Sequence, residues 1–289
     1  MIKIEAHNVY KEFDVTNEAG KREKLVVLDN FELTVEQGEF LAILGPSGCG
    51  KSSFLNILAG LDHQNSGDIL IDGRSVLDNQ FNRGVVFQGY ALFPWRTVLD
   101  NVAVGLEIRG VGREERERIA YEYLNLVGLR AFAKRYPHQL SGGMKQRVAI
   151  ARVLAYQPDI LLMDEPFAAL DAQTRELLQF ELLRIWEADK KTILFVTHSI
   201  DEAILMADRV AVMTARPGKV KEIIDIPLPR PRTGEIRNSP EFARIRQRAW
   251  ELIKDEVFLA QHLEKDDNEE HRQESRHQQG DDQRHEKVS

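Results

Sequence analysis

The residues most able to do chemistry form a glycine-rich stretch near the start of the chain. Residues 45–52 read Gly-Pro-Ser-Gly-Cys-Gly-Lys-Ser, a full match to the pattern G-x-x-x-x-G-K-[ST]. Glycines let successive backbone N–H groups converge on phosphate oxygens. Lys51 would then reach the β- and γ-phosphates, and the Ser52 hydroxyl would ligate Mg²⁺. A glycine-rich turn with an incidental lysine is the weaker alternative, because an apolar strand at 40–44 precedes the loop and residues 53–59 can follow as a helix.

Two carboxylates form a second candidate site at the end of an apolar run. Residues 160–163 read Ile-Leu-Leu-Met, and Asp164 and Glu165 follow directly. Such a pair lies at the carboxyl edge of a parallel sheet, where open α/β folds bind ligands. Asp164 would hold the Mg²⁺ shell, and Glu165 would polarise an attacking water. A strand followed by Asp-Glu is common, so the pair gains its meaning from the rest of the chain.

A third element reads Leu-Ser-Gly-Gly-Met at residues 140–144, directly before a helical pattern. Its free backbone N–H groups make a second array that could grip a phosphate. A kinase or a small GTPase needs only one such cradle. Two cradles so far apart in the sequence indicate that the second one serves the nucleotide of another copy of the chain.

The composition limits the classes of protein that these elements can serve. The chain has 289 residues, of which 43% are hydrophobic and 29% charged, and its net charge is −7. This balance disfavours binding of nucleic acid by blanket phosphate neutralisation. The single cysteine, Cys49, excludes an internal disulfide framework. No apolar run approaches the ~20 residues of a membrane span, and we expect neither a secretory signal nor a nucleic-acid partner.

Short apolar runs predict the strands that would position these residues. Residues 40–44, 160–163 and 192–196 have the character of buried parallel strands. Between the last two, residues 173–188 repeat apolar side chains at helical spacing. Strand, helix and strand in this order predict a βαβ unit of a parallel sheet.

The flanking regions have other patterns. Residues 2–10 and 25–35 alternate loosely, which predicts an antiparallel sheet with a solvated hairpin turn at 17–21. Residues 97–157 are rich in helical spacing, and residues 242–253 outline one more amphipathic helix.

The chain changes character after residue 261. From His262 to Ser289 only Leu263 and Val288 are clearly apolar, and the segment is acidic. Such a segment cannot bury enough surface to offset its ordering entropy, so we expect disorder. Its four histidines lack the i, i+4 spacing that presents two metal ligands on one helical face, and a solvated tail is therefore the favoured interpretation. They are His262, His271, His277 and His285.

A locally basic stretch precedes this tail. We interpret it as an exposed helix face and its lead-in, with a regulatory or lipid-headgroup contact as the alternative. Its members are Arg230, Arg232, Arg244, Arg246 and Arg248.

Six motifs occur in the order found in ATP-binding subunits of ABC transporters, which the chain resembles from about residue 2 to residue 256. Two small departures are Met144, where Gln is commonest, and Ala168-Ala169, where Ser-Ala is usual. Neither removes a backbone N–H group or a charge. The motifs are Walker A at 45–52, Gln88 of the Gln loop, the signature at 140–144, Walker B at 160–165, the D-loop Ala169-Leu170-Asp171 and the switch histidine His198.

The resemblance implies an α/β fold of the P-loop NTPase class. It has a mixed central sheet, an N-terminal antiparallel β subdomain and an inserted α-helical subdomain. The ATPase domain would span 1–260, with the helical subdomain at about 89–157 and a C-terminal strand and helix at about 215–258. The disordered tail would span 261–289.

The resemblance also implies that two copies sandwich two ATP molecules with Mg²⁺. Glu165 is then the general base or water-orienting residue, His198 contacts the γ-phosphate, and Phe13 matches the aromatic that stacks on adenine. The expected Mg²⁺ ligands are Ser52, Gln88 and Asp164. The expected nucleotide-binding residues are Phe13, Gly45, Pro46, Ser47, Gly48, Cys49, Gly50, Lys51, Ser52, Ser53, Gln88, Ser141, Gly142, Gly143, Met144 and Asp171.

An aromatic stretch at 89–95 follows the Gln loop. It is either core of the helical subdomain or a groove for a partner helix, and in the family this region receives the membrane subunit. The resemblance therefore implies separate permease subunits, an indirect link to a solute-binding protein, and a place on the cytoplasmic face of the cell membrane. Residues 92–98 and 214–218 further resemble importers of nitrate, sulfonates and taurine, which implies a small anion as the solute.

Other P-loop proteins remain as alternatives. Soluble ABC ATPases of translation control and DNA repair usually carry two ATPase domains or a long coiled-coil insertion, and this chain has neither pattern. A nucleotide kinase would leave Ser141-Gly142-Gly143 and His198 without a role. We therefore expect the ATP-hydrolysing subunit of an importer, with a non-transport ABC ATPase as the second hypothesis.

Overall fold

The computed structural model describes the backbone of residues 1–16, 20, 22–78 and 81–285, and the side chains within these ranges as far as Leu263. Within these residues, no helix is both long and apolar enough to cross a bilayer.

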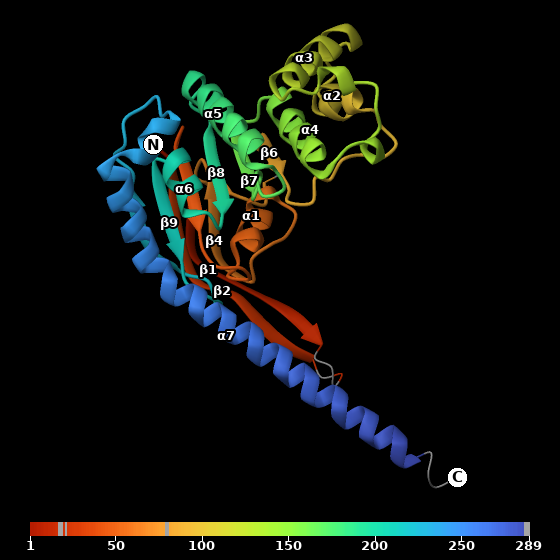
Figure 1. Cartoon of the computed structure of the whole chain (residues 1–289), viewed down its shortest axis with the longest axis vertical. Coiled ribbons are helices and arrows are strands. Elements are labelled where there is room, and N and C mark those ends of the chain that lie inside the picture. Colours follow the sequence, from red (N-terminus) through yellow and green to blue (C-terminus); the bar gives the residue numbers. More distant parts are fainter. Residues whose placement is uncertain (17–19, 21, 79–80, 286–289) are drawn as a thin grey trace.

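A six-stranded sheet forms the centre of the molecule, with the strand order β10-β9-β3-β8-β7-β6 (Figure 1). Only β10 runs antiparallel to its neighbour, so the sheet is mixed, as predicted. Three of its strands, β3, β7 and β8, are buried along their whole length, because a hydrophobic core lies against each face of the sheet. The strands are β3 (Phe40–Leu44), β6 (Arg83–Val86), β7 (Ile160–Asp164), β8 (Thr192–Thr197), β9 (Arg209–Met213) and β10 (Val220–Asp225).

The predicted βαβ unit is present. Strand β7 leads through α5 (Ala172–Ala188) to β8, and the two strands pair in parallel. The helix turns Leu178, Leu182 and Trp186 into the core, which is the apolar face that the helical spacing predicted. The short helix α6 (Ile200–Met206) follows β8 and leads to β9.

A second, antiparallel sheet has the order β2-β1-β4-β5. Helix α1 (Lys51–Ala59) shares a core with this sheet, and the rings of Phe31 and Phe54 lie 4.5 Å apart. The first two strands are longer than predicted, and the expected hairpin turn at 17–21 lies outside the described residues except for Gly20. The strands are β1 (Ile2–Thr16), β2 (Arg22–Glu36), β4 (Ser66–Ile71) and β5 (Arg74–Ser75).

A group of helices lies between β6 and β7 and projects to one side of the central sheet (Figure 1). Helix α2 packs against both α3 and α4, and the chain between α3 and α4 contains two short 3₁₀ turns. The elements are α2 (Val98–Ile108), α3 (Arg113–Leu126), η1 (Arg130–Phe132), η2 (Pro137–Gln139) and α4 (Gly142–Ala155).

The C-terminal part contains η3 (Gly234–Asn238) and the long helix α7 (Pro240–His285). Helix α7 packs against α6, β9 and β10 and then extends beyond the body of the molecule (Figure 1). We expected disorder from residue 261, whereas the backbone remains helical to His285. Its Glu, Gln, Lys and Arg residues have high helix propensity, which favours continuation of a helix that the core has already nucleated.

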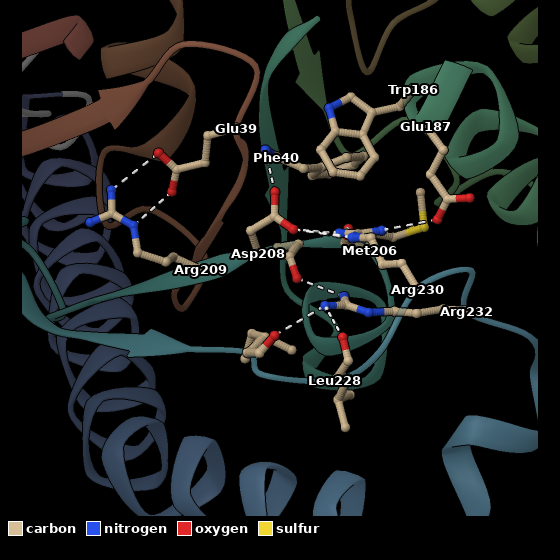
Figure 2. A network of polar contacts seen from close by, with 12 residues as sticks. Glu39, Phe40, Trp186, Glu187, Met206, Asp208, Arg209, Leu228, Arg230 and Arg232 are labelled. Atoms are coloured by element: carbon tan, nitrogen blue, oxygen red, sulfur yellow. Dashed lines mark hydrogen bonds and ion pairs between the residues drawn. The ribbon is translucent and has the colours of Figure 1, made fainter. Parts of the chain in front are cut away.

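The interpretation of Arg230 and Arg232 as part of an exposed face is wrong. Figure 2 shows both guanidinium groups pointing into a polar network between β9 and the segment before η3. Arg232 is only 4% exposed, and its Nη1 donates to three carbonyls at the end of α6, on Ile204, Leu205 and Ala207. Arg230 donates to Asp208 at 2.8 Å. These residues thus attach the C-terminal segment to the core.

Candidate active site

The glycine-rich loop joins the end of β3 to the start of α1. Gly48 and Gly50 have φ values of 72° and 102°, a left-handed conformation that favours glycine. A Cβ atom at Gly50 would lie 2.7 Å from Leu28 Cδ2 and 2.9 Å from the Val27 carbonyl oxygen. Space and backbone conformation therefore both require glycine here, and the loop can present its N–H groups at the N-terminus of α1.

Lys51 lies inside this loop and is only 6% exposed. Its Nζ donates to the carbonyl oxygens of Gly45 and Pro46, at 2.9 and 2.7 Å. Cys49 is fully buried beside it, and burial raises the pKa of the Cys49 thiol although the nearby ammonium opposes this shift. The side chain of Cys49 thus fills space in the loop, and Lys51 holds the positive charge.

Asp164 ends β7 at the carboxyl edge of the sheet. Burial raises the pKa of its carboxyl group, while a hydrogen bond from the Ser52 hydroxyl opposes that shift. A carboxylate and a hydroxyl oxygen therefore lie side by side, and such oxygens suit Mg²⁺, which completes its shell with water and phosphate oxygens. No cluster of three or more His, Cys, Asp or Glu fit for a metal occurs among the described residues. These two residues fit a metal that arrives with a phosphate ligand.

Glu165 adopts an unusual backbone conformation, with a φ of 45°. Its N–H donates to the Val196 carbonyl oxygen of β8 at 3.0 Å, which keeps the turn against the neighbouring strand. The carboxylate meets two further predicted residues, since Glu165 Oε1 lies 3.1 Å from His198 Nδ1 and Gln88 Nε2 donates to Oε2 at 3.5 Å. A non-glycine residue held at positive φ is a strained feature typical of functional sites.

His198 follows β8, and hydrogen bonds of the residues on both sides of it fix the backbone at this position. The Ser199 hydroxyl caps α6, and the Ser199 N–H donates to Thr197 Oγ1 at 3.0 Å. Thr197 in turn donates to the buried Glu202 at 2.8 Å. Burial raises the pKa of Glu202, and the hydrogen bond from Thr197 opposes that shift. The imidazole itself stays 62% exposed, so it can meet a ligand.

The signature begins α4. Ser141 is the N-cap, and its hydroxyl accepts from the Met144 N–H at 3.3 Å. A Cβ atom at Gly142 would lie 3.0 Å from the Tyr90 hydroxyl oxygen, and one at Gly143 would lie 3.4 Å from the Ala169 carbonyl oxygen. The signature therefore packs near the Gln loop and the D-loop of its own chain, while Met144 packs its side chain against the core.

The signature, Asp171 and Phe13 are not among the side chains that contact Glu165. Figure 1 places α4, which carries the signature, away from α1 and the glycine-rich loop. Asp171 is the N-cap of α5. Its carboxylate accepts a hydrogen bond from the Thr174 N–H, and this bond lowers the pKa of the carboxyl group. Phe13 lies on β1 with 37% of its surface exposed, and Lys11 Nζ lies 4.6 Å from its ring centre.

The structure thus brings together Ser52 with Asp164, and Gln88 and His198 with Glu165. Gln88 was expected as a metal ligand, and its amide lies against Glu165. The glycine-rich loop before α1 and the signature at the start of α4 lie apart within the single chain (Figure 1).

Two residues that take part in this arrangement were missed in the sequence. Tyr90 has a φ of 62°, and its hydroxyl lies beside Gly142 of the signature. Arg152 donates a hydrogen bond to the carbonyl oxygen of Tyr90 at 3.2 Å. Glu202 supports the strand that carries His198. A tyrosine after the Gln loop and a glutamate on an amphipathic helix carry no sequence signal of such contacts.

Comparison with known proteins agrees with this geometry. The model of the ABC transporter family matches residues 28–168. An uncharacterized ABC transporter ATP-binding protein of Methanocaldococcus jannaschii is 54% identical over 257 residues, covering 89% of this chain and 93% of the relative. A nitrate import ATP-binding protein of Synechocystis is 46% identical, covering 81% and 91%, and a taurine import ATP-binding protein of Rhizobium johnstonii is 49% identical, covering 76% and 86%.

A solved structure is similar as well. It is a dimeric ATP-binding cassette in a post-hydrolysis state, bound to ADP and Pi, with 36% sequence identity and a TM-score of 0.68. The match covers 77% of this chain and 98% of that one. The expected fold class is therefore confirmed.

Proposed function

Because the chain belongs to the family of ABC transporter ATP-binding proteins, which bind and hydrolyse ATP, we propose that it is the ATPase subunit of an importer. Two copies would close around two ATP molecules. In each site Lys51 and Ser52 would come from one copy and Ser141, Gly142 and Gly143 from the other.

The single observation that carries this proposal is the convergence of side chains on Glu165. The strands β6, β7 and β8 are neighbours in the sheet, and their ends bring Gln88 and His198 within hydrogen-bonding reach of Glu165, which follows Asp164. A carboxylate fixed by two polar neighbours at the carboxyl edge of a P-loop sheet is suited to orient a water for attack on a phosphate.

The residues divide the chemistry among themselves. Mg²⁺, held by Ser52 and Asp164, would neutralise charge on the transferring phosphoryl group. Lys51 would leave the carbonyl oxygens of Gly45 and Pro46 to neutralise the β- and γ-phosphates. Glu165 would orient the water and accept its proton, and His198 would contact the γ-phosphate. Gln88 would exchange its hydrogen bond with Glu165 for a place in the Mg²⁺ shell when ATP is bound, and Phe13 would cover the adenine.

The helical insertion supports the proposed contact with a permease. Trp95 is 71% exposed and Ile108 81% exposed, so these large apolar side chains are not core. Ile108 lines a groove of about 460 Å³ between the insertion and the central sheet, together with Phe87 and Phe93. The ring of Trp95 lies 5.5 Å from the ring of Phe93, beside this groove. Exposed aromatic anchors beside a groove suit an amphipathic partner helix. We therefore place the subunit on the cytoplasmic face of the membrane, linked indirectly to a solute-binding protein.

The solute would be a small anion. The relatives named for nitrate and for taurine import are 46% and 49% identical to this chain. The motifs at 92–98 and 214–218 also support this class. The choice of solute would depend on the permease and the solute-binding protein, because no residue of the proposed ATP site would touch it.

The sandwich can be tested at Ser141. In a Glu165→Gln background that blocks hydrolysis, we expect Ser141→Asp to leave the ATP affinity of the single chain unchanged and to abolish ATP-dependent dimers. Aspartate keeps the N-cap of α4, so the helix should remain, but its charge would repel the phosphate of the partner's nucleotide.

Ser141→Asn is the matched control, because it caps the helix without a charge. A fluorescent ATP analogue measures affinity, and light scattering after size exclusion measures the dimer. If Ser141→Asp weakens ATP binding by the monomer itself, the signature faces its own nucleotide. If the aspartate variant still dimerises with ATP, the signature lies outside the nucleotide site. Either result would contradict the proposal.

A further inference from the structure

The segment Thr214-Ala215-Arg216-Pro217-Gly218 has no place in the mechanism above. It forms the turn between β9 and β10, and we call it the 214–218 turn. Strand β9 pairs with β3, so the last residue of the turn lies against the glycine-rich loop that follows β3.

Gly218 makes an unusually close approach to that loop. A Cβ atom built at Gly218 would lie 2.0 Å from the Cys49 carbonyl oxygen and 2.6 Å from Met213 Cε. Its φ lies outside the left-handed range, so the requirement is for space and not for a special backbone conformation. The obstacle is a backbone carbonyl, which cannot move away as a flexible side chain can.

Hydrogen bonds hold Gly218 in this place. Its N–H donates to the Val27 carbonyl oxygen at 2.8 Å, and its own carbonyl accepts from the Asp29 N–H at 3.3 Å. Thr214 closes the turn, since its Oγ1 donates to the Pro217 carbonyl oxygen at 3.1 Å and accepts from the Lys219 N–H at 3.0 Å. Gly218 is thus clamped to β2 on one side and lies against Cys49 on the other.

The contact concerns one particular peptide group of the glycine-rich loop. In a trans peptide the C=O and the following N–H point in opposite directions. The carbonyl of Cys49 faces Gly218, so the N–H of Gly50, in the same peptide plane, faces away from Gly218. The N–H groups of this loop are the ones expected to cradle phosphate.

We propose that Gly218 is a positioning residue for ATP binding: its lack of a side chain lets the Cys49–Gly50 peptide keep the orientation that presents the Gly50 N–H to phosphate. This inference rests on the proposed nucleotide site. It predicts an effect on affinity for ATP, with little effect on the chemical step, because the group concerned binds ground state and transition state alike.

Gly218→Ala is the direct test. We expect KM for ATP and the dissociation constant of a fluorescent ATP analogue to rise about ten- to a hundredfold, the range for one charge-assisted hydrogen bond. The kcat at saturating ATP should change less than about twofold. The single cysteine adds a local readout: displacement of its peptide should make Cys49 react faster with iodoacetamide. Gly112→Ala is the matched control, because Gly112 has a φ of −56° and open space around its Cα.

Thr214→Val serves if Gly218→Ala does not fold. It removes the hydroxyl that closes the turn, and we expect KM for ATP to rise about two- to threefold with kcat unchanged. Lys51→Ala distinguishes a failure of the role proposed for Gly218 from a failure of the proposed ATP site. If Lys51→Ala abolishes ATP binding while folded Gly218→Ala and Thr214→Val bind ATP like the wild type, the role of Gly218 is refuted and the site stands. If Lys51→Ala binds ATP normally, the site itself is refuted.

Discussion

Oε1 of Glu165 lies 3.1 Å from Nδ1 of His198, and the two residues come from the adjacent strand ends of β7 and β8. The backbone of Glu165 is left-handed, with a φ of 45°, directly after β7. The two side chains are therefore in direct contact at the carboxyl edge of the sheet, and we expect them to act as a unit in which the histidine orients the carboxylate.

The first prediction concerns the carboxylate. Glu165→Gln keeps the size and the contacts of the side chain but removes its ability to take a proton. We expect ATP hydrolysis to fall by about 10²–10⁴-fold while ATP still binds, so that nucleotide-bound dimers accumulate. Phosphate release and light scattering with Mg²⁺ and ATP measure the two effects. Glu114→Gln, in the first turn of α3, is the control; equal activity of the two variants would exclude Glu165 as the base.

The second prediction concerns the coupling within the pair. His198→Ala should lower kcat by about 10²-fold. Because both side chains act on the same water and phosphate, the double variant with Glu165→Gln should be scarcely slower than Glu165→Gln alone. Single-turnover hydrolysis of the four proteins completes the cycle. If the double variant were slower by the product of the two single reductions in rate, His198 would act independently of Glu165.

The sequence was most informative where burial imposes a simple pattern. The runs at 40–44 and 192–196 lie in parallel strands of the central sheet and are covered on both faces, so every residue in them except Thr192 is apolar. A strand predicted at 160–163 also predicts that Asp164 and Glu165 lie at the sheet edge. The pattern of apolar residues within each short segment was therefore sufficient to predict these strands and the position of the two carboxylates.

The features that were not predicted depend on contacts between distant segments. Arg232 looked like a surface residue because its partners are backbone carbonyls, which any residue type can supply. The contact of Gly218 with Cys49 could not be predicted either, because its partner is again a backbone carbonyl. Only the folded chain brings Gln88 to Glu165, since the two residues are 77 positions apart in the sequence, with the helices α2 to α4 between β6 and β7.

The third prediction concerns Arg232. Its guanidinium donates to carbonyls of α6 and of the segment at 226–228, and Arg232→Met would leave these acceptors buried without donors. We expect the free energy of unfolding to fall by about 3 kcal/mol or more. Arg244→Met, on the exposed face of α7, should change it by less than about 0.5 kcal/mol. Urea denaturation measures both; similar midpoints for the two variants would show that the network in Figure 2 contributes little.

The last prediction concerns the Cys49 thiol. Burial raises its pKa, and the thiolate is the species that reacts with iodoacetamide. At a given pH the native protein therefore holds less thiolate than the unfolded chain, and its alkylation should keep accelerating at pH values where the reaction in urea has levelled off. Because folding disfavours this thiolate, the group also destabilises the native state as pH rises above the ordinary thiol range.

ATP should slow the alkylation of Cys49 further, because phosphate bound by the loop holds the surrounding peptides in place. Lys51→Ala is the control, since it removes the charge that binds ATP and should remove the protection with it. Mass spectrometry of the single-cysteine chain follows the reaction at each pH. A native protein that reacts as fast as the urea-unfolded chain at neutral pH would mean that Cys49 is accessible and that the loop is not packed as the structure shows.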